Sequence, residues 1–506
     1  MTESSVNIKG EIKKLSSDAG IYGIGKAITS MVSVITAPIL AYVFIPAEFG
    51  ALMLVQTFAG FVVYFAGLNL NSGVFYHYFK AKDADIKKTI LSTAFIFFIV
   101  FGFAIALFTE VLASSIESLL LVSSSLNGVQ NEENVYRYAD YIGILAIWIF
   151  FSLINTNFQS VLRMTRKPKR FVMLSISSVI INLIFIVILV IFLEGGIEGV
   201  LRANVFSAVI VSIVGFFMVA NNYRFVFSWS WFRKILSYSL PQFPSGVMNL
   251  ALIQLNVYFL NYYTNTTELG YYSIAFKVAS GFLIFTAAFR MAWDPLALSL
   301  MEKNGSTEFY SRIYTLFNVG MGLLACFVAL MAKPLLIMIT PQEYHESYII
   351  VSILIFAFLI QGSSNILAVG INISAKTKFI SYAQFVALVA NVLLNLVLVP
   401  NMGAWGAASA FLGGVIAQNL AYYFFTKYVY PIPFLYWKMQ LYVVVLLVLV
   451  GAEAKIVENF DFSLSLIVGV AFILVCVTWA WWIGLGENDR KRLRGIFSAP
   501  LAKLSL

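Results

Sequence analysis

Charged residues are scarce in this chain. Only 11% of the 506 residues are Asp, Glu, Lys or Arg, whereas about 25% is usual for a soluble domain. Hydrophobic residues make up 60% of the sequence. Because a water-soluble fold needs a larger charged surface than this, the composition excludes an ordinary soluble protein.

Cysteine and histidine are also nearly absent, with two of each. Cys326 and Cys476 both lie in apolar stretches, so they indicate neither a disulfide framework nor a thiolate metal site. His77 and His345 are far apart in sequence, and the chain has no metal-ligand cluster, Gly-x-Ser-x-Gly elbow or nucleotide-binding motif. These absences argue against an enzyme, a metal cofactor and direct use of ATP.

What the sequence has in abundance is apolar stretches close to the ~20 residues that cross a bilayer. They predict an all-α integral membrane protein with about fourteen spans and no separate soluble domain. The predicted spans lie at about 20 to 44, 51 to 76, 89 to 112, 141 to 162, 171 to 193, 200 to 221, 237 to 263, 269 to 293, 311 to 332, 346 to 370, 379 to 399, 405 to 426, 438 to 452 and 463 to 483.

The net charge of +9 is concentrated in short loops on one side of these spans, which argues against a nucleic-acid partner. With the N-terminus inside, 26 of the 33 Lys and Arg residues face the cytoplasm, and four face outward. This asymmetry predicts that both termini are cytoplasmic. The longest exterior loop, at about 113 to 140, is rich in Ser, Asn and Glu and predicts no folded module.

Two weak internal repeats predict two halves. A shift of 220 residues pairs Tyr42 with Tyr262, Glu48 with Glu268, Gly50 with Gly270, Ala59 with Ala279 and Phe65 with Phe285. A shift of 207 places Gly196 and Gly199 on Gly403 and Gly406. Six spans in each half would give both halves the same orientation, with a site between them. Glycine-containing turns recurring by chance are the alternative explanation.

The predicted organisation follows from these halves. A cytoplasmic lead-in (1–19) precedes an N-terminal six-helix half (20–221), a cytoplasmic linker (222–236), a C-terminal six-helix half (237–426), two additional helices (427–483) and a basic cytoplasmic tail (484–506). The two halves would enclose a central cavity.

Several motifs recur in a recognisable order. They are Pro38 with Pro46-Ala47-Glu48-Phe49-Gly50, Leu240-Pro241 with Pro244, Glu268-Leu269-Gly270, Tyr272-Ser273-Ile274-Ala275-Phe276-Lys277, and Pro400 with Gly403, Gly406, Ala407 and Ala408. In order and spacing they resemble the polysaccharide-transport branch of the multidrug/oligosaccharidyl-lipid/polysaccharide exporter superfamily, which includes O-antigen and exopolysaccharide repeat-unit flippases. The resemblance covers most of the first twelve spans.

The resemblance implies a flippase of the bacterial inner membrane that moves a polyprenyl-diphosphate-linked oligosaccharide by alternating access. The cargo would be an O-antigen (lipopolysaccharide), capsule or exopolysaccharide repeat unit. The implied partners are this substrate, membrane lipids and other polysaccharide-assembly proteins, and the implied coupling ion is H⁺ or Na⁺. Family members often carry an acidic-basic pair in span seven, where this chain has Asn256 and Val257.

A diphosphate needs cations, and three basic residues fall inside predicted spans: Lys26, Lys277 and Arg290. They are candidates to bind the anion at different depths. The alternative is snorkelling, in which the long side chain carries its charge to the membrane surface. Arg290 and Asp294 are four residues apart, so they predict either a gate or coupling acid, or a plain ion pair.

The glycan could be bound by polar and aromatic side chains of spans one, seven and eight, chiefly Tyr22, Gln254 and Asn256. Tyr258, Tyr262 and Tyr272 fit an interfacial aromatic belt slightly better. Glu48 is a candidate gating residue. Pro241 and Pro244 predict either a hinge in span seven or simply its first turn.

Three other classes remain open. A membrane enzyme acting on lipid-linked glycans is disfavoured by the missing catalytic motifs. A cation-coupled multidrug exporter shares the resemblance, although basic intramembrane charges suit an anionic cargo better. A structural scaffold is disfavoured because charges at membrane depth are costly to keep.

Overall fold

The computed structural model describes residues 35–126, 138–301, 305–458, 460 and 462–484, and these residues form helices and no strands. Twelve described helical segments are long and apolar enough to cross a membrane. One of them, α17 (Lys378–Val429), contains two predicted spans and is kinked at Gly403. The predicted span at about 20 to 44 lies mostly outside the described residues, of which 35–43 are helical. The all-α polytopic membrane fold is confirmed.

The first group of helices extends to residue 222. It comprises α2 (Pro46–Gly67), α3 (Leu70–Lys80), α4 (Ala84–Val111), α5 (Ala113–Leu126), α6 (Tyr138–Met164), α7 (Pro168–Ile186), η1 (Val187–Phe192), α8 (Gly196–Val219) and η2 (Ala220–Asn222). The predicted exterior loop is therefore helical over its first part, where Leu120 accepts a hydrogen bond from Asn261 Nδ2 at 3.0 Å. The serine-rich sequence of α5 hid a helix that packs against the other half.

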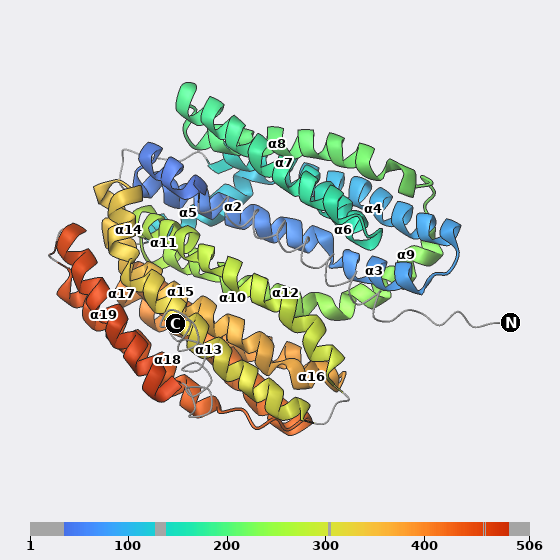
Figure 1. The fold of residues 1–506 in the computed structure, drawn as a ribbon. Helices are drawn as coiled ribbons and strands as arrows, with labels where there is room; N and C mark the ends of the chain where they lie inside the picture. The colour runs from blue at the N-terminus through green and yellow to red at the C-terminus, as the bar shows by residue number, and fades with distance from the viewer. Residues whose placement is uncertain (1–34, 127–137, 302–304, 459, 461, 485–506) are drawn as a thin grey trace, which may run out of the picture.

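The second group begins inside the predicted linker. It comprises α9 (Trp229–Ser239), η3 (Leu240–Gln242), α10 (Phe243–Tyr263), α11 (Thr266–Ala279), η4 (Ser280–Phe282), α12 (Leu283–Ser299), α13 (Ser306–Leu330), α14 (Ala332–Ile339), η5 (Gln342–Ser347), α15 (Tyr348–Leu367), α16 (Val369–Ile373), α17, α18 (Tyr436–Ile456), α19 (Phe462–Trp479) and η6 (Ala480–Gly484). Figure 1 shows α2 to α8 on one side of the molecule and α10 to α19 on the other.

Both sequence repeats have a structural counterpart. Gly196 and Gly403, which the shift of 207 residues pairs, both have positive φ, at 55° and 52°. Each stands where the backbone turns into a helix, and glycine adopts this conformation without the strain that other residues incur. The repeat was therefore preserved by backbone geometry and not by side-chain chemistry.

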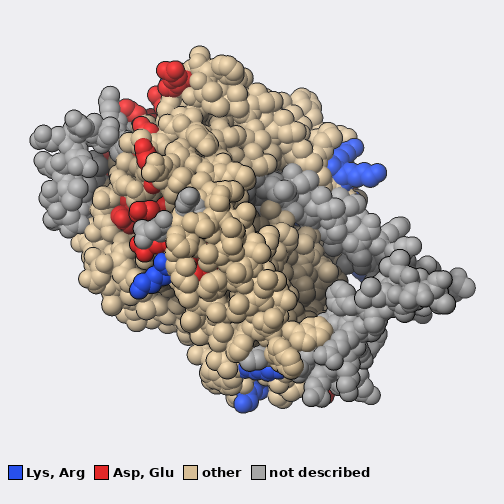
Figure 2. Space-filling view, turned by 60° about the vertical axis from the view of Figure 1, so that its left-hand side comes forward, with Lys and Arg blue, Asp and Glu red and all other residues tan. Residues whose placement is uncertain are grey.

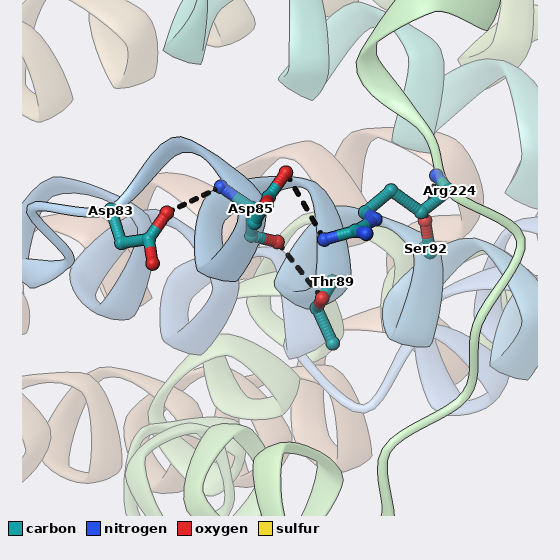
Figure 3. A network of polar contacts seen from close by, with 5 residues as sticks. All are labelled: Asp83, Asp85, Thr89, Ser92 and Arg224. Atoms are coloured by element: carbon teal, nitrogen blue, oxygen red, sulfur yellow. Dashed lines mark hydrogen bonds and ion pairs between the residues drawn. The ribbon is translucent and has the colours of Figure 1, made fainter.

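The segment that leads into α9 is tied to the start of α4 (Figure 3). Asp83 accepts a hydrogen bond from the Asp85 amide at 2.8 Å and so caps α4. Asp85 pairs with Arg224 at 3.0 Å, and the Arg224 amide donates to Ser92 Oγ at 2.8 Å. These contacts fix where α9 begins.

The end of the bundle at which α2 and α11 begin is rich in acidic residues. Glu48, Asp140 and Glu198 surround Tyr141, and Glu268, Glu343 and Glu346 surround Tyr271. Figure 2 shows acidic side chains gathered over one part of the surface with few basic ones among them. This is the end that the loop charges predict to lie outside.

Candidate functional site

Lys277 lies on the wall of a cavity between the two halves. The cavity has a volume of about 330 Å³ and is lined by residues from α2, α10, α11, η4 and α12. Its lining residues are Met53, Gln56, Thr57, Gln254, Phe276, Lys277, Ser280 and Leu283. The site that the sequence predicted from Lys277 and Gln254 therefore brings these two residues together, and we call it the Lys277 cavity.

The Lys277 ammonium group is held by an aromatic ring. Its Nζ lies 4.7 Å from the centroid of the Phe49 ring, a cation–π contact. Phe49 in turn packs edge-on against Tyr344, whose hydroxyl donates to the Phe44 carbonyl at 2.6 Å. Among the described residues, no carboxylate forms an ion pair with Lys277. The positive charge is therefore directed into the cavity and is available to an anion.

The cavity also contains polar atoms without partners. Thr57 Oγ1 and Gln254 Oε1 are buried and make no hydrogen bond. Because a buried polar atom without a partner costs about 1 to 3 kcal/mol, such atoms are usual where a ligand or water completes the bonding. None of the lining residues is acidic. A cation, a hydroxyl and amide groups together suit an anion that carries hydroxyl groups.

Gln56 and Thr57 are site residues that the sequence reasoning missed. Both lie on α2, within an apolar span in which they are two of the few polar side chains. That isolation in an apolar helix was the available signal. Their position shows that the N-terminal half contributes the wall facing Lys277.

Asn256 lies elsewhere. It is completely buried, and its Oδ1 accepts hydrogen bonds from Asn391 Nδ2 at 3.1 Å and from Asn395 Nδ2 at 2.9 Å. The three asparagines join α10 to α17 and do not line the Lys277 cavity. Tyr272 is also completely buried, so its assignment to an interfacial belt is wrong.

Arg290 and Asp294 form an ion pair at 3.2 Å on one face of α12. Their side chains are 60% and 54% exposed, and neither lines the Lys277 cavity. The structure thus separates Arg290 from Lys277. The pair has the geometry of the plain surface ion pair that the spacing allowed.

The remaining predicted residues have local contacts or lie outside the described part. Glu48 accepts a hydrogen bond from the Ile45 amide at 3.3 Å at the start of α2. Pro241 lies in the 3₁₀ turn η3, and Pro244 lies in the first turn of α10. Lys26 and Tyr22 fall among residues 1–34, outside the described residues.

Comparison with protein families gives one match. The family described as "Polysaccharide biosynthesis protein" matches residues 15–301, which is more than half of the chain. No curated protein sequence matches the chain.

Solved structures give matches over nearly the whole chain. The lipid II flippase MurJ in an inward closed conformation is 16% identical, with a TM-score of 0.69, and the match covers 90% of this chain and 98% of that one. A mutant of the Vibrio cholerae MATE transporter VcmN is 14% identical, with a TM-score of 0.56 and coverage of 83% and 97%. A MOP superfamily transporter from Pyrococcus furiosus is 14% identical, with a TM-score of 0.51 and coverage of 82% and 94%. At these identities the likeness establishes the fold.

Proposed function

Since the chain belongs to the polysaccharide biosynthesis protein family and has the fold of MOP superfamily transporters, we propose that it is a flippase for a polyprenyl-diphosphate-linked oligosaccharide. The cargo is the repeat unit of an O-antigen, capsule or exopolysaccharide. The family and the fold indicate a transporter and not an enzyme.

The observation that carries this proposal is the isolated cation of the Lys277 cavity. A positive charge at membrane depth costs roughly 2.5 to 3.5 kcal/mol, so it is retained where it has a function. A diphosphate neutralises it with charge-assisted hydrogen bonds. Gln56, Thr57 and Gln254 supply the donors and acceptors that sugar hydroxyls need.

The size of the cavity implies a conformational change. At about 330 Å³ it lies at the lower end of ligand pockets, which span about 300 to 1,000 Å³. It holds a diphosphate with at most the nearest sugar. An oligosaccharide can therefore enter or leave only when α2 and α10 move apart, as alternating access requires.

The protein works in this proposal in the bacterial inner membrane with both termini in the cytoplasm. The concentration of Lys and Arg in loops on one side supports this orientation. Substrate would enter from the cytoplasmic leaflet and leave at the end that is rich in acidic residues. Like charges at that end favour release of a diphosphate.

The test is a flipping assay with purified protein in liposomes. A fluorescent polyprenyl-diphosphate oligosaccharide should become accessible to an external glycosidase in protein-containing vesicles and not in empty ones. A phospholipid with the same fluorophore and a fluorescent organic cation serve as competing cargoes. Transport of the organic cation without the saccharide lipid would indicate a multidrug exporter and overturn the proposal.

A further inference from the structure

A second and larger cavity opens where α3, the end of α6 and η3 meet. Its volume is about 950 Å³. Two basic residues reach it from different helices, Lys80 at the end of α3 and Arg163 near the end of α6. Asn71, Ser72, Tyr76 and Tyr238 also line it. We call it the inner cavity, because its helix ends carry the basic loops.

The walls of the inner cavity are fixed. Gly73 packs so closely against α9 that its amide donates to Ser239 Oγ at 3.1 Å. One turn further along each helix, the rings of Tyr76 and Tyr238 stack at 4.2 Å with an interplanar angle of 11°. The Asp85–Arg224 ion pair holds the start of α9, as described above. The cavity is therefore built by packed elements and not by a loose surface loop.

The chemistry of the inner cavity favours an anion with attached sugars. None of its lining residues is Asp or Glu. Arg163 Nη2 donates to Ser160 Oγ at 3.1 Å, which directs the planar guanidinium, and Lys80 lies 5.6 Å from the centre of the Tyr76 ring. Asn71 Oδ1 is buried without a hydrogen bond, so the cavity also offers an acceptor for a hydroxyl group. Aromatic rings cover the apolar faces of sugars.

The inner cavity is separate from the Lys277 cavity. The two lie along the same run of helix, since Thr57 lines one and Ser72 the other, about 20 Å apart at 1.5 Å per residue. Between them Tyr64 stacks on Phe243 at 5.8 Å. The Tyr64 hydroxyl occupies the space that a side chain at Gly246 would need. This contact between α2 and α10 closes the route in the described state.

From these contacts we propose that the inner cavity is a distinct first binding site for the diphosphate end of the lipid-linked saccharide. Lys80 and Arg163 hold the diphosphate there before the Tyr64–Gly246 contact opens and passes it to Lys277. The proposal rests on the proposed function for the identity of the natural cargo. The binding of a diphosphate by Lys80 and Arg163 can be measured without transport.

The experiment titrates purified full-length protein with geranyl diphosphate, a soluble isoprenyl diphosphate, and follows heat release. We expect two binding events in the wild type. The double variant Lys80→Gln/Arg163→Gln should lose one event, with affinity weakened about tenfold or more, and Lys277→Gln should lose the other. Lys82→Gln removes an exposed lysine two residues from Lys80 and outside the cavity, so it should bind like the wild type.

The outcomes separate the alternatives. Unchanged binding of both equivalents by the double variant would overturn the proposal, provided that its size-exclusion profile and melting curve match the wild type. If the double variant does not fold, Arg163→Gln and charge-preserving Arg163→Lys are compared, and equal affinity of both would also overturn it. Competition by phosphatidylglycerol as strong as that by inorganic pyrophosphate would mean that the cavity binds ordinary lipid headgroups instead. A failed flipping assay with intact geranyl diphosphate binding would refute the proposed function alone.

Discussion

Gly50 and Gly270 face each other's helices at the same crossing. A side chain at Gly50 would collide with the Thr266 carbonyl oxygen, and one at Gly270 would collide with the Pro46 carbonyl oxygen. Pro46 and Thr266, like the two glycines, are separated by 220 residues. The contact is therefore reciprocal, as at an interface between two copies related by a twofold axis. Helices α2 and α11 are equivalent elements of the two halves, and they touch directly.

This crossing predicts a large effect of the smallest added side chain. In Gly50→Ala the new methyl group meets backbone that cannot rotate away, so α2 and α11 must separate. Overpacking of this kind costs about 1 to 3 kcal/mol. We expect a lower melting temperature in detergent by intrinsic fluorescence. Gly60→Ala on the same helix has no atom within 4 Å of the new methyl and should melt like the wild type or slightly higher. Equal melting of the two variants would contradict the reciprocal contact.

The sequence predicted the spans well because their signal is local. Apolar length is read within each segment, and the break between two spans in α17 coincides with Gly403, next to Pro400. The repeat also identified Gly50 and Gly270 as equivalent. It could not show that they touch, because a match between positions carries no information about distance. Helix α5 was missed because its serines resemble a loop when the packing against α10 is unknown.

The site was predicted in part for the same reason. Lys277 and Gln254 were identified because each is a polar group in an apolar helix. Asn256 has the same signal, yet its partners are Asn391 and Asn395, which lie more than 130 residues further along the chain. Lys80 and Arg163 were counted among the loop charges, since only the fold brings the ends of α3 and α6 together.

The asparagine cluster predicts a stability effect that is separate from transport. In Asn256→Ala the amide groups of Asn391 and Asn395 lose a shared acceptor inside the protein. Each buried donor left without a partner costs about 1 to 3 kcal/mol. We expect a clear drop in melting temperature, with flipping per folded molecule largely kept. Asn401→Ala removes an exposed amide from α17 and should change neither. Loss of flipping at unchanged stability would instead place Asn256 in the substrate path.

The exposed pair on α12 predicts small effects. Arg290 and Asp294 are both more than half exposed, and exposed pairs contribute roughly 0.2 to 1 kcal/mol. We expect Arg290→Gln, Asp294→Asn and the double variant to stay within this range in a thermodynamic cycle, with flipping close to the wild type. A collapse of flipping in either single variant that the double variant restores would show that the pair acts as a gate.

Energy coupling can be tested without identifying an ion site. The sequence contains no nucleotide-binding motif, so we expect flipping to depend on an ion gradient. Vesicles are prepared with a proton gradient and a sodium gradient, and each is collapsed separately with a selective ionophore. A fall in the initial rate with one ionophore identifies the coupling ion. Unchanged rates after both gradients are collapsed would refute coupling to either ion.

Lys277 provides the most direct prediction about the substrate. Lys277→Ala removes the charge from the Lys277 cavity, so the diphosphate meets only neutral groups in a medium of low dielectric constant, where an uncompensated anion is very costly. We expect flipping to fall at least tenfold. Lys277→Arg keeps the charge and should keep part of the activity, although the wider guanidinium has to fit beside Phe49. Lys455→Ala, at an exposed position in α18, controls for the loss of any lysine from a membrane helix. Flipping by Lys277→Ala at the wild-type rate and equal expression would remove Lys277 from the substrate site.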